Sequence, residues 1–303
     1  QGTPISVEVH IGSGLPGFTV VGLPDEACRE ARDRVRAALL SSGAEWPNKK
    51  ITVNLAPSSQ RKGGVGLDLA LAMGILSASG QMSSDNLAEY SFVAELGLDG
   101  SLRPVPGAAP LVAGLRETRV VVALPNAREA KVASPRSIHC AATLRDVVLA
   151  LRGDGERLDT SSQEKIQASS HIADMSDVRG QPTARLAAEI AAAGSHHILF
   201  VGSPGAGKTM IAERLPGLLP PLTNEEAVTA TMIHSAAGAS LPPGGLITFP
   251  PFRAPHHSAS MIAMVGGGSS VLRPGEASLA HSGVLFLDEV GEFMPSVLDA
   301  LRQ

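Results

Sequence analysis

Eight consecutive residues in the second half of the chain could bind the phosphates of a nucleotide. They have the form of a P-loop, in which glycines let successive backbone N–H groups curl around phosphate oxygens. The residues are Gly202, Ser203, Pro204, Gly205, Ala206, Gly207, Lys208 and Thr209. We expect the Lys208 ammonium to reach the β- and γ-phosphates and the Thr209 hydroxyl to ligate Mg²⁺. The stretch therefore predicts binding of ATP with Mg²⁺, aided by the dipole of a helix that starts at Gly207.

A pair of acidic residues follows a second apolar run about 80 positions later. Four apolar residues, Val284–Leu287, precede Asp288 and Glu289. Open α/β sheets bind ligands at the carboxyl ends of their strands, so both carboxylates are expected beside the phosphates. We predict that Asp288 holds Mg²⁺ through water and that Glu289 activates the attacking water. Glu289 and Lys208 are therefore the predicted catalytic residues.

The elements around these motifs indicate an α/β domain. Residues 182–193 are Ala-rich and predict a helix, and Thr223 with Glu226 forms a capping box that opens a helix through about Ala237. The runs His197–Val201 and Val284–Leu287 are apolar without alternation. Continuous apolar runs that end at polar motifs are typical of buried parallel strands. A parallel sheet is therefore expected here.

The first half of the chain predicts an α/β domain of its own, with mixed strands. Apolar residues alternate with polar ones at the start, which indicates a half-buried strand, and apolar residues four apart from Ala27 to Leu39 indicate a helix between Pro24 and Gly43. The predicted strands are 5–11, 18–21, 51–55 and 120–124, the predicted hairpin is 92–96 with 101–105, and the further helices are 67–79 and 144–151.

A polar stretch without periodicity separates the two halves. It runs from Gly153 through Ser170 and beyond, and it predicts a linker at 153–175 between domains at 1–152 and 176–303. The chain begins at Gln1 without an initiating Met, and it stops at Gln303 inside a predicted helix that directly follows the acidic motif. We therefore expect a fragment whose second domain is truncated.

Composition excludes several classes of protein. The net charge is −4, with 16 basic against 14 acidic residues in 1–152 and 9 against 15 in 153–303. Neither half is strongly basic, and aromatic residues make up only 3%, so charge and stacking do not by themselves predict nucleic-acid binding. No apolar run approaches the roughly 18–20 residues of a membrane span. We therefore expect no membrane partner. Two distant cysteines, Cys28 and Cys140, predict reduced thiols in the cytoplasm.

Several specific strings resemble one family over nearly the whole chain. The sequence is similar to the magnesium-chelatase-like AAA+ ATPases, and most closely to the YifB/ComM family. The strings that carry the resemblance are 14–17 (GLPG), 21–24 (VGLP), 30–36 (EARDRVR), 52–57 (TVNLAP), 254–258 (APHHS) and 273–276 (RPGE).

The resemblance implies a fold for each half: a Lon-protease-like α+β domain of the ribosomal S5 type, then the AAA+ module. Lon-type proteolysis needs a serine activated by a lysine. In this chain the matching stretches place Gly66 at the serine and Ala109 at the lysine. The expected Lon-like domain therefore has no catalytic dyad, and we predict no protease activity.

The resemblance also implies a homo-hexameric ring that moves on DNA, with branch migration as its activity. Arg29, Arg32 and Arg36 share one helix face and could meet DNA phosphates. The alternative is a solvated face that pairs with Asp25, Glu30 and Asp33. The polar sensor, arginine finger and lid arginine of such ATPases would lie beyond Gln303, so we expect nucleotide binding to exceed hydrolysis.

The adjacent His256 and His257 keep three interpretations: a metal site, a nucleotide-sensing or subunit-contact role implied by the family, or simple packing. Neighbouring side chains diverge unless the backbone is irregular. Two other functions of the whole chain also remain open. One is a magnesium-chelatase motor subunit that powers metal insertion into a porphyrin, and the other is a scaffold built on a degenerate Lon-like module.

Overall fold

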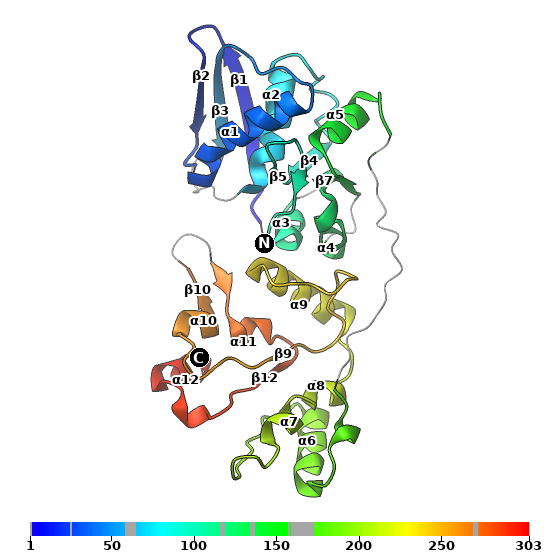
Figure 1. Cartoon of the computed structure of the whole chain (residues 1–303), viewed down its shortest axis with the longest axis vertical. Coiled ribbons are helices and arrows are strands. Elements are labelled where there is room, and N and C mark those ends of the chain that lie inside the picture. Colours follow the sequence, from blue (N-terminus) through cyan, green and yellow to red (C-terminus); the bar gives the residue numbers. More distant parts are fainter. Residues whose placement is uncertain are drawn as a thin grey trace. The chain divides into compact units, whose positions relative to one another are not determined.

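The computed structural model divides the chain into two compact units, Gln1–Lys165 and Ile166–Gln303 (Figure 1). Each is described by itself. The structure describes residues 2–24, 26–57, 65–115, 119–133, 137–156, 158, 173–268 and 272–302, without the side chains of residues 27, 29 and 65. Most of the expected linker, residue 157 and residues 159–172, lies outside the described residues, and so does Asp25.

The first unit opens with a three-stranded mixed sheet in the order β1-β3-β2. Of these three strands, only β3 buries every second side chain completely, as expected for the middle strand. β1 pairs with it antiparallel and β2 pairs with it parallel. The strands are β1 (Ser6–Gly12), β2 (Gly17–Val21) and β3 (Lys50–Ala56), and the helices beside them are α1 (Glu26–Ser41), the 3-10 turn η1 (Val65–Leu67) and α2 (Asp68–Ala78).

A second three-stranded sheet in this unit is wholly parallel, in the order β4-β7-β8. A short antiparallel pair, β5 with β6, stands beside it. The strands are β4 (Tyr90–Val93), β5 (Glu95–Leu96), β6 (Leu102–Arg103), β7 (Arg119–Ala123) and β8 (Ile138–Ala141). The helices are α3 (Ala108–Ala113), η2 (Leu124–Asn126), α4 (Ala127–Ala133) and α5 (Leu144–Arg152).

The core of the first unit forms where α1 and α2 meet each other and α2 meets β1. α2 is apolar around most of its circumference, and residues such as Leu69, Ile75 and Leu76 are fully buried. Gly74 lets the helix approach the strand closely, because a Cβ there would lie 2.7 Å from Val9 Cγ2. The side chains between α1, α2 and β1 are therefore packed as closely as in an ordinary domain core.

One charged pair is enclosed in that core. Asp68 is fully buried, and its carboxylate accepts hydrogen bonds from Arg34 Nε at 2.7 Å and Nη2 at 3.1 Å. The backbone N–H of Leu96 donates to the same carboxylate at 3.3 Å. Burial raises the pKa of the Asp68 carboxyl, while Arg34 acts in the opposite direction. The pair ties α1, α2 and β5 together.

Most predicted elements of the first half are present, but the predicted hairpin is wrong in extent. Phe92 belongs to the parallel sheet, and only two residues on each side pair antiparallel. β8, α3 and α4 were not predicted, because each is short and weakly patterned. Of the two Lon-like stretches, Gly66 is half-buried and Ala109 is buried, whereas residues 58–64, with Lys62, lie outside the described residues.

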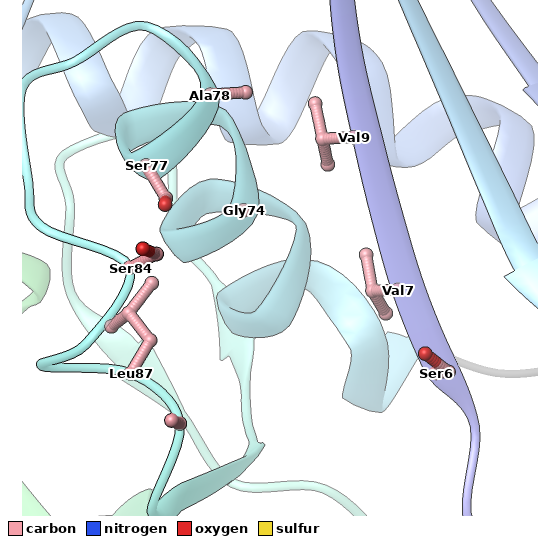
Figure 2. A pocket seen from close by; sticks show the side chains of 9 residues that line it. Ser6, Val7, Val9, Gly74, Ser77, Ala78, Ser84 and Leu87 are labelled. Atoms are coloured by element: carbon pink, nitrogen blue, oxygen red, sulfur yellow. The ribbon is translucent and has the colours of Figure 1, made fainter.

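The first unit also contains a groove of about 450 Å³ between β1, the end of α2 and the loop that precedes β4 (Figure 2). Three serine hydroxyl groups and several aliphatic side chains line it. The lining residues are Ser6, Val7, Val9, Gly74, Ser77, Ala78, Ser84, Leu87 and Ala88. None of these lining residues is titratable, so they supply no base that could activate a serine.

The described residues of the second unit form mainly helices joined by long connections, and each strand among them is two residues long. The helices are η3 (Met175–Asp177), α6 (Pro182–Gly194), α7 (Lys208–Ala212), α8 (Leu215–Leu218), α9 (Asn224–Ala237), α10 (Met261–Val265), α11 (Glu276–Leu279), η4 (Val290–Glu292) and α12 (Pro295–Arg302). The strands are β9 (Phe252–Arg253), β10 (Gly266–Gly267), β11 (Arg273–Pro274) and β12 (Val284–Leu285). β9 and β12 pair parallel, and β10 and β11 pair antiparallel.

The prediction of a buried strand at His197–Val201 is wrong. The segment carries no strand pairing, and Leu199 and Val201 are 74% and 88% exposed. Ile198 and Phe200 pack against a cluster that contains Ala188 and Ile211. Apolar residues on both faces predicted burial on both faces, but the described residues cover only one of them.

The second predicted strand is shorter than expected. Only Val284 and Leu285 pair, and the whole run is half-buried, with Phe286 beside Phe252 at 6.0 Å between ring centroids. The parallel sheet of this unit therefore consists of β9 and β12 within the described residues. Across both units the fold is a mixed α/β arrangement with parallel strand pairs.

Candidate functional site

The eight predicted phosphate-binding residues form a loop directly before α7. Gly205 and Gly207 adopt left-handed backbone conformations, with φ of +77° and +85°. A Cβ at Gly205 would meet nothing within 4 Å, so the need for glycine there comes from the backbone conformation and not from crowding. Alternating backbone conformations of this kind turn successive N–H groups toward a common point, which suits an anion.

The side chain of Lys208 folds back over this loop. Its Nζ donates hydrogen bonds to the carbonyl oxygens of Gly202 at 2.9 Å and Ser203 at 3.1 Å. The ammonium group is therefore held next to the backbone that would surround the phosphates. A triphosphate is a stronger partner for an ammonium group than two neutral carbonyls, so these bonds can be exchanged for charge-assisted ones.

The two predicted motifs meet through side chains that lie 79 positions apart in sequence. The Thr209 hydroxyl donates to Asp288 Oδ2 at 3.2 Å. A threonine hydroxyl that ligates Mg²⁺ can keep such a bond while the carboxylate contacts a water bound to the same ion, which is the arrangement predicted from the sequence. Both groups are oxygen donors, the type that Mg²⁺ prefers. The residues therefore fit the predicted ion.

Glu289 lies beside this pair but turns to a different partner. Its backbone N–H donates to Asp288 Oδ1 at 3.0 Å, and its own Oε2 lies 3.9 Å from His257 Nδ1. The side chain is 69% exposed, which leaves it accessible to water. The structure thus brings Lys208, Thr209 and Asp288 together with Glu289 in one unit.

A bidentate ion pair supports the strand that carries the acidic residues. Arg253 on β9 donates to Glu276 on α11, from Nε at 2.6 Å and from Nη2 at 2.7 Å. The hydrogen bond to Glu276 raises the pKa of Arg253, so this guanidinium stays charged. The backbone N–H of Phe286 donates to the Arg253 carbonyl at 2.8 Å, which joins β9 to the segment just before Asp288.

Gln181 contacts the phosphate-binding loop, although the sequence did not single it out. Its Nε2 donates to the Ala206 carbonyl at 3.0 Å, and its backbone is left-handed with φ of +55°. The sequence Gly-Gln-Pro at the start of a helix could have indicated an unusual backbone conformation at this residue. Nothing in the sequence, however, linked that turn to a loop 25 residues later.

The two adjacent histidines do not diverge as expected. The rings of His256 and His257 lie 4.0 Å apart between centroids, with a 37° angle between their planes. They sit in a turn after β9 and outside regular structure, which allows neighbouring rings to meet. No cluster of three His, Cys, Asp or Glu side chains that could hold a metal ion occurs within the described residues, so the metal interpretation gains no support.

The arginine-rich face of α1 gives mixed evidence. Arg32 lies 3.7 Å from Asp33, and Arg34 lies 3.8 Å from Glu30 in addition to its buried bond with Asp68. Of these contacts only the one between Arg32 and Asp33 involves the predicted face, and it matches the solvated, paired alternative. The side chain of Arg29 and residue Asp25 lie outside the described part of the chain.

Comparison with known proteins gives matches over both halves of the chain. Residues 174–303 match the family described as magnesium chelatase, subunit ChlI, and residues 7–127 match the family described as subunit ChlI of Mg-chelatase. None of the helices in the described part of the chain combines the length and hydrophobicity of a membrane span.

Individual relatives align over nearly the full chain. It is 47% identical over 302 residues to the uncharacterized protein YifB of Salmonella typhimurium and 46% identical over 315 residues to the competence protein ComM of Haemophilus influenzae. The YifB protein of Escherichia coli is 46% identical over 302 residues. These alignments cover 99–100% of this chain and 59–60% of each relative, so the chain spans about three fifths of their length. Two family matches and this identity show that the chain belongs to the YifB/ComM family of magnesium-chelatase-like AAA+ proteins.

Proposed function

We propose that the chain binds ATP with Mg²⁺ at the loop 202–209 and hydrolyses it with Glu289 as the general base. The contact between Thr209 and Asp288 carries this proposal, because it joins the phosphate-binding loop to the acidic motif at a spacing suited to one ion. The family match supports a nucleotide-dependent protein.

The residues have separate tasks in this scheme. The loop amides and Lys208 bind and orient the β- and γ-phosphates, and Thr209 with Asp288 holds Mg²⁺, which neutralises charge on the phosphate oxygens when it is bound. Glu289 accepts a proton from water as the water oxygen bonds to the γ-phosphorus. The bond from that phosphorus to the bridging oxygen breaks, and ADP keeps the electron pair.

Replacement of Glu289 by Gln tests the assignment of the base. We expect Glu289→Gln to keep the affinity for ATP and to lose turnover, because Gln is isosteric but cannot take the proton. Binding is measured with a fluorescent ATP analogue and turnover by release of labelled phosphate. Turnover that persists in this variant would remove Glu289 from the role of base.

We further propose that the protein works as a homo-hexamer in which ATP turnover remodels DNA, in the manner implied by its resemblance to the ComM type. The relative from Haemophilus influenzae is named a competence protein, which supports a connection with DNA. In this proposal the first unit is a Lon-like module of the ribosomal S5 type without protease chemistry. Gly66 and Ala109 at the positions of the dyad support that assignment.

The family description also supports a second candidate, a motor subunit for insertion of a metal into a porphyrin. ATPase assays on the full-length protein with branched DNA, linear DNA and no DNA distinguish the two. Stimulation by branched DNA supports DNA remodelling. Indifference to all DNA favours the metal-insertion motor or a non-catalytic scaffold, and a scaffold would in addition show no turnover.

A further inference from the structure

Two neighbouring carboxylates in the second unit have different partners. Asp288 Oδ2 accepts the hydrogen bond from Thr209, whereas Glu289 Oε2 lies 3.9 Å from His257 Nδ1. That distance is too long for a direct hydrogen bond, but one bridging water or a small rotation of the side chain spans it. The two acids thus contact different side chains.

The backbone at Glu289 is unusual for a residue with a side chain. Glu289 has a φ of +51°, in the left-handed region that costs a residue with a Cβ about 1 kcal/mol or more. Its carbonyl accepts the N–H of Glu292 at 2.8 Å, which begins η4. Such strain persists where the surrounding structure requires it, and it often marks a functional position.

The His257 ring packs against a neighbour that is itself held by hydrogen bonds. The His256 ring packs against it at 4.0 Å, and His256 Nδ1 is 2.8 Å from the Ser258 hydroxyl. The N–H of Ala259 donates to the His256 carbonyl at 2.9 Å, which closes the turn. Because β9 pairs with β12, the turn after β9 and the acidic residues after β12 emerge from neighbouring strands at the same end.

We propose that His257 is a positioning residue that holds the Glu289 carboxylate through Nδ1 and so keeps it available to water and separate from the Mg²⁺ ligands. The proposal rests on the proposed role of Glu289 as the base. A ring that is fixed by packing can orient a carboxylate at little entropic cost. Loss of His257 should therefore lower the rate of hydrolysis and leave nucleotide affinity unchanged.

Three substitutions at one position test the role of Nδ1. In His257→Asn the amide nitrogen takes the place of Nδ1 in the bonding sequence, whereas in His257→Gln it lies one bond farther out. We expect ATP hydrolysis to fall at least ten-fold in His257→Ala and His257→Gln, and less than about three-fold in His257→Asn. The Kd for a fluorescent ATP analogue should stay within two-fold of wild type in all three, which also shows that the site is folded.

Two further variants set the controls. His10→Ala removes an exposed histidine of β1 in the first unit and should leave hydrolysis unchanged. In a Glu289→Gln background, His257→Ala should cause no additional loss, because the group through which it acts is already gone.

The possible results separate the two proposals. Wild-type hydrolysis that persists unchanged in His257→Ala, equal losses in the Asn and Ala variants, or multiplied losses in the double variant would each overturn the role of His257 and leave the proposed ATPase intact. A full-length wild-type protein that binds ATP with Mg²⁺ but never releases phosphate would overturn both.

Discussion

The two units of this chain differ in how many of their side chains are buried in a core. The first unit buries a large apolar cluster around α1, α2 and two sheets. Its charged pair, Arg34 with Asp68, joins elements of this core. The second unit has small apolar clusters, exposes Leu199 and Val201, and carries the phosphate-binding loop and both acidic residues at its surface. Glycines reflect the same contrast, since Gly74 permits close packing while Gly205 and Gly207 shape an anion site. Side chains available for chemistry are therefore separated from those that provide stability.

The largest expected effect of a single substitution lies in the second unit. Lys208→Ala should weaken ATP binding by at least about 1,000-fold, or about 4.1 kcal/mol, because the variant loses the ammonium group that contacts the phosphates. The fluorescence of Trp46, the only tryptophan of the chain, reports on the first unit through its contact with Phe18. It should be unaffected. A shift of the Trp46 unfolding curve in Lys208→Ala would contradict the separation of the two units.

The next effect lies in the core of the first unit. Asp68→Asn should lower the free energy of unfolding by about 3 kcal/mol, because it leaves the Arg34 guanidinium without its buried counter-charge. Urea unfolding followed by Trp46 fluorescence measures it, and the affinity for ATP should not change. Asp33→Asn on the same region of α1 is the matched control, since that side chain is 85% exposed and should cost under about 0.5 kcal/mol. Similar losses in both variants would show that Asp68 has no special place in the core.

The smallest effect compares one device that occurs in both units. Thr143 with Asp146 caps α5, and Thr223 with Glu226 caps α9. Thr143→Ala and Thr223→Ala should each cost about 1 kcal/mol, seen as faster amide hydrogen exchange in the capped helix of that unit alone. Faster exchange in the other unit as well would mean that the units do not respond independently.

Acid should weaken the second of these caps. The hydrogen bond from Thr223 lowers the pKa of the Glu226 carboxyl below its usual 4.5. A lowered pKa in the folded state stabilises the protein above the ordinary value, and this contribution is lost as the pH falls through the folded pKa. The protection factors of the α9 amides, which correct for the intrinsic effect of pH on exchange, should therefore fall below about pH 4.5 in wild type and change less in Thr223→Ala.

Features that depend on the local spacing of residues could be predicted from the sequence. The helix of α1, the cap at Thr223 and the loop at 202–209 follow from periodicity or from fixed residue types, and the structure has a helix, a capping box and a glycine-shaped turn at these places. Features that depend on contacts between residues far apart in the sequence could not be predicted. An apolar run such as His197–Val201 shows that burial is favourable but not which face is covered. The contacts of Gln181 with Ala206 and of His257 with Glu289 join segments without any shared pattern.

The contact between Thr209 and Asp288 is the feature on which the nucleotide site depends, and a double-mutant cycle across it tests the site. ATP affinity is measured with and without Mg²⁺ for wild type, Thr209→Val, Asp288→Asn and the double variant. We expect Mg²⁺ to tighten binding in wild type, either single variant to lose most of that gain, and the double variant to lose little more. Binding that is indifferent to Mg²⁺ in wild type, or losses that multiply in the double variant, would show that these two side chains do not serve one ion.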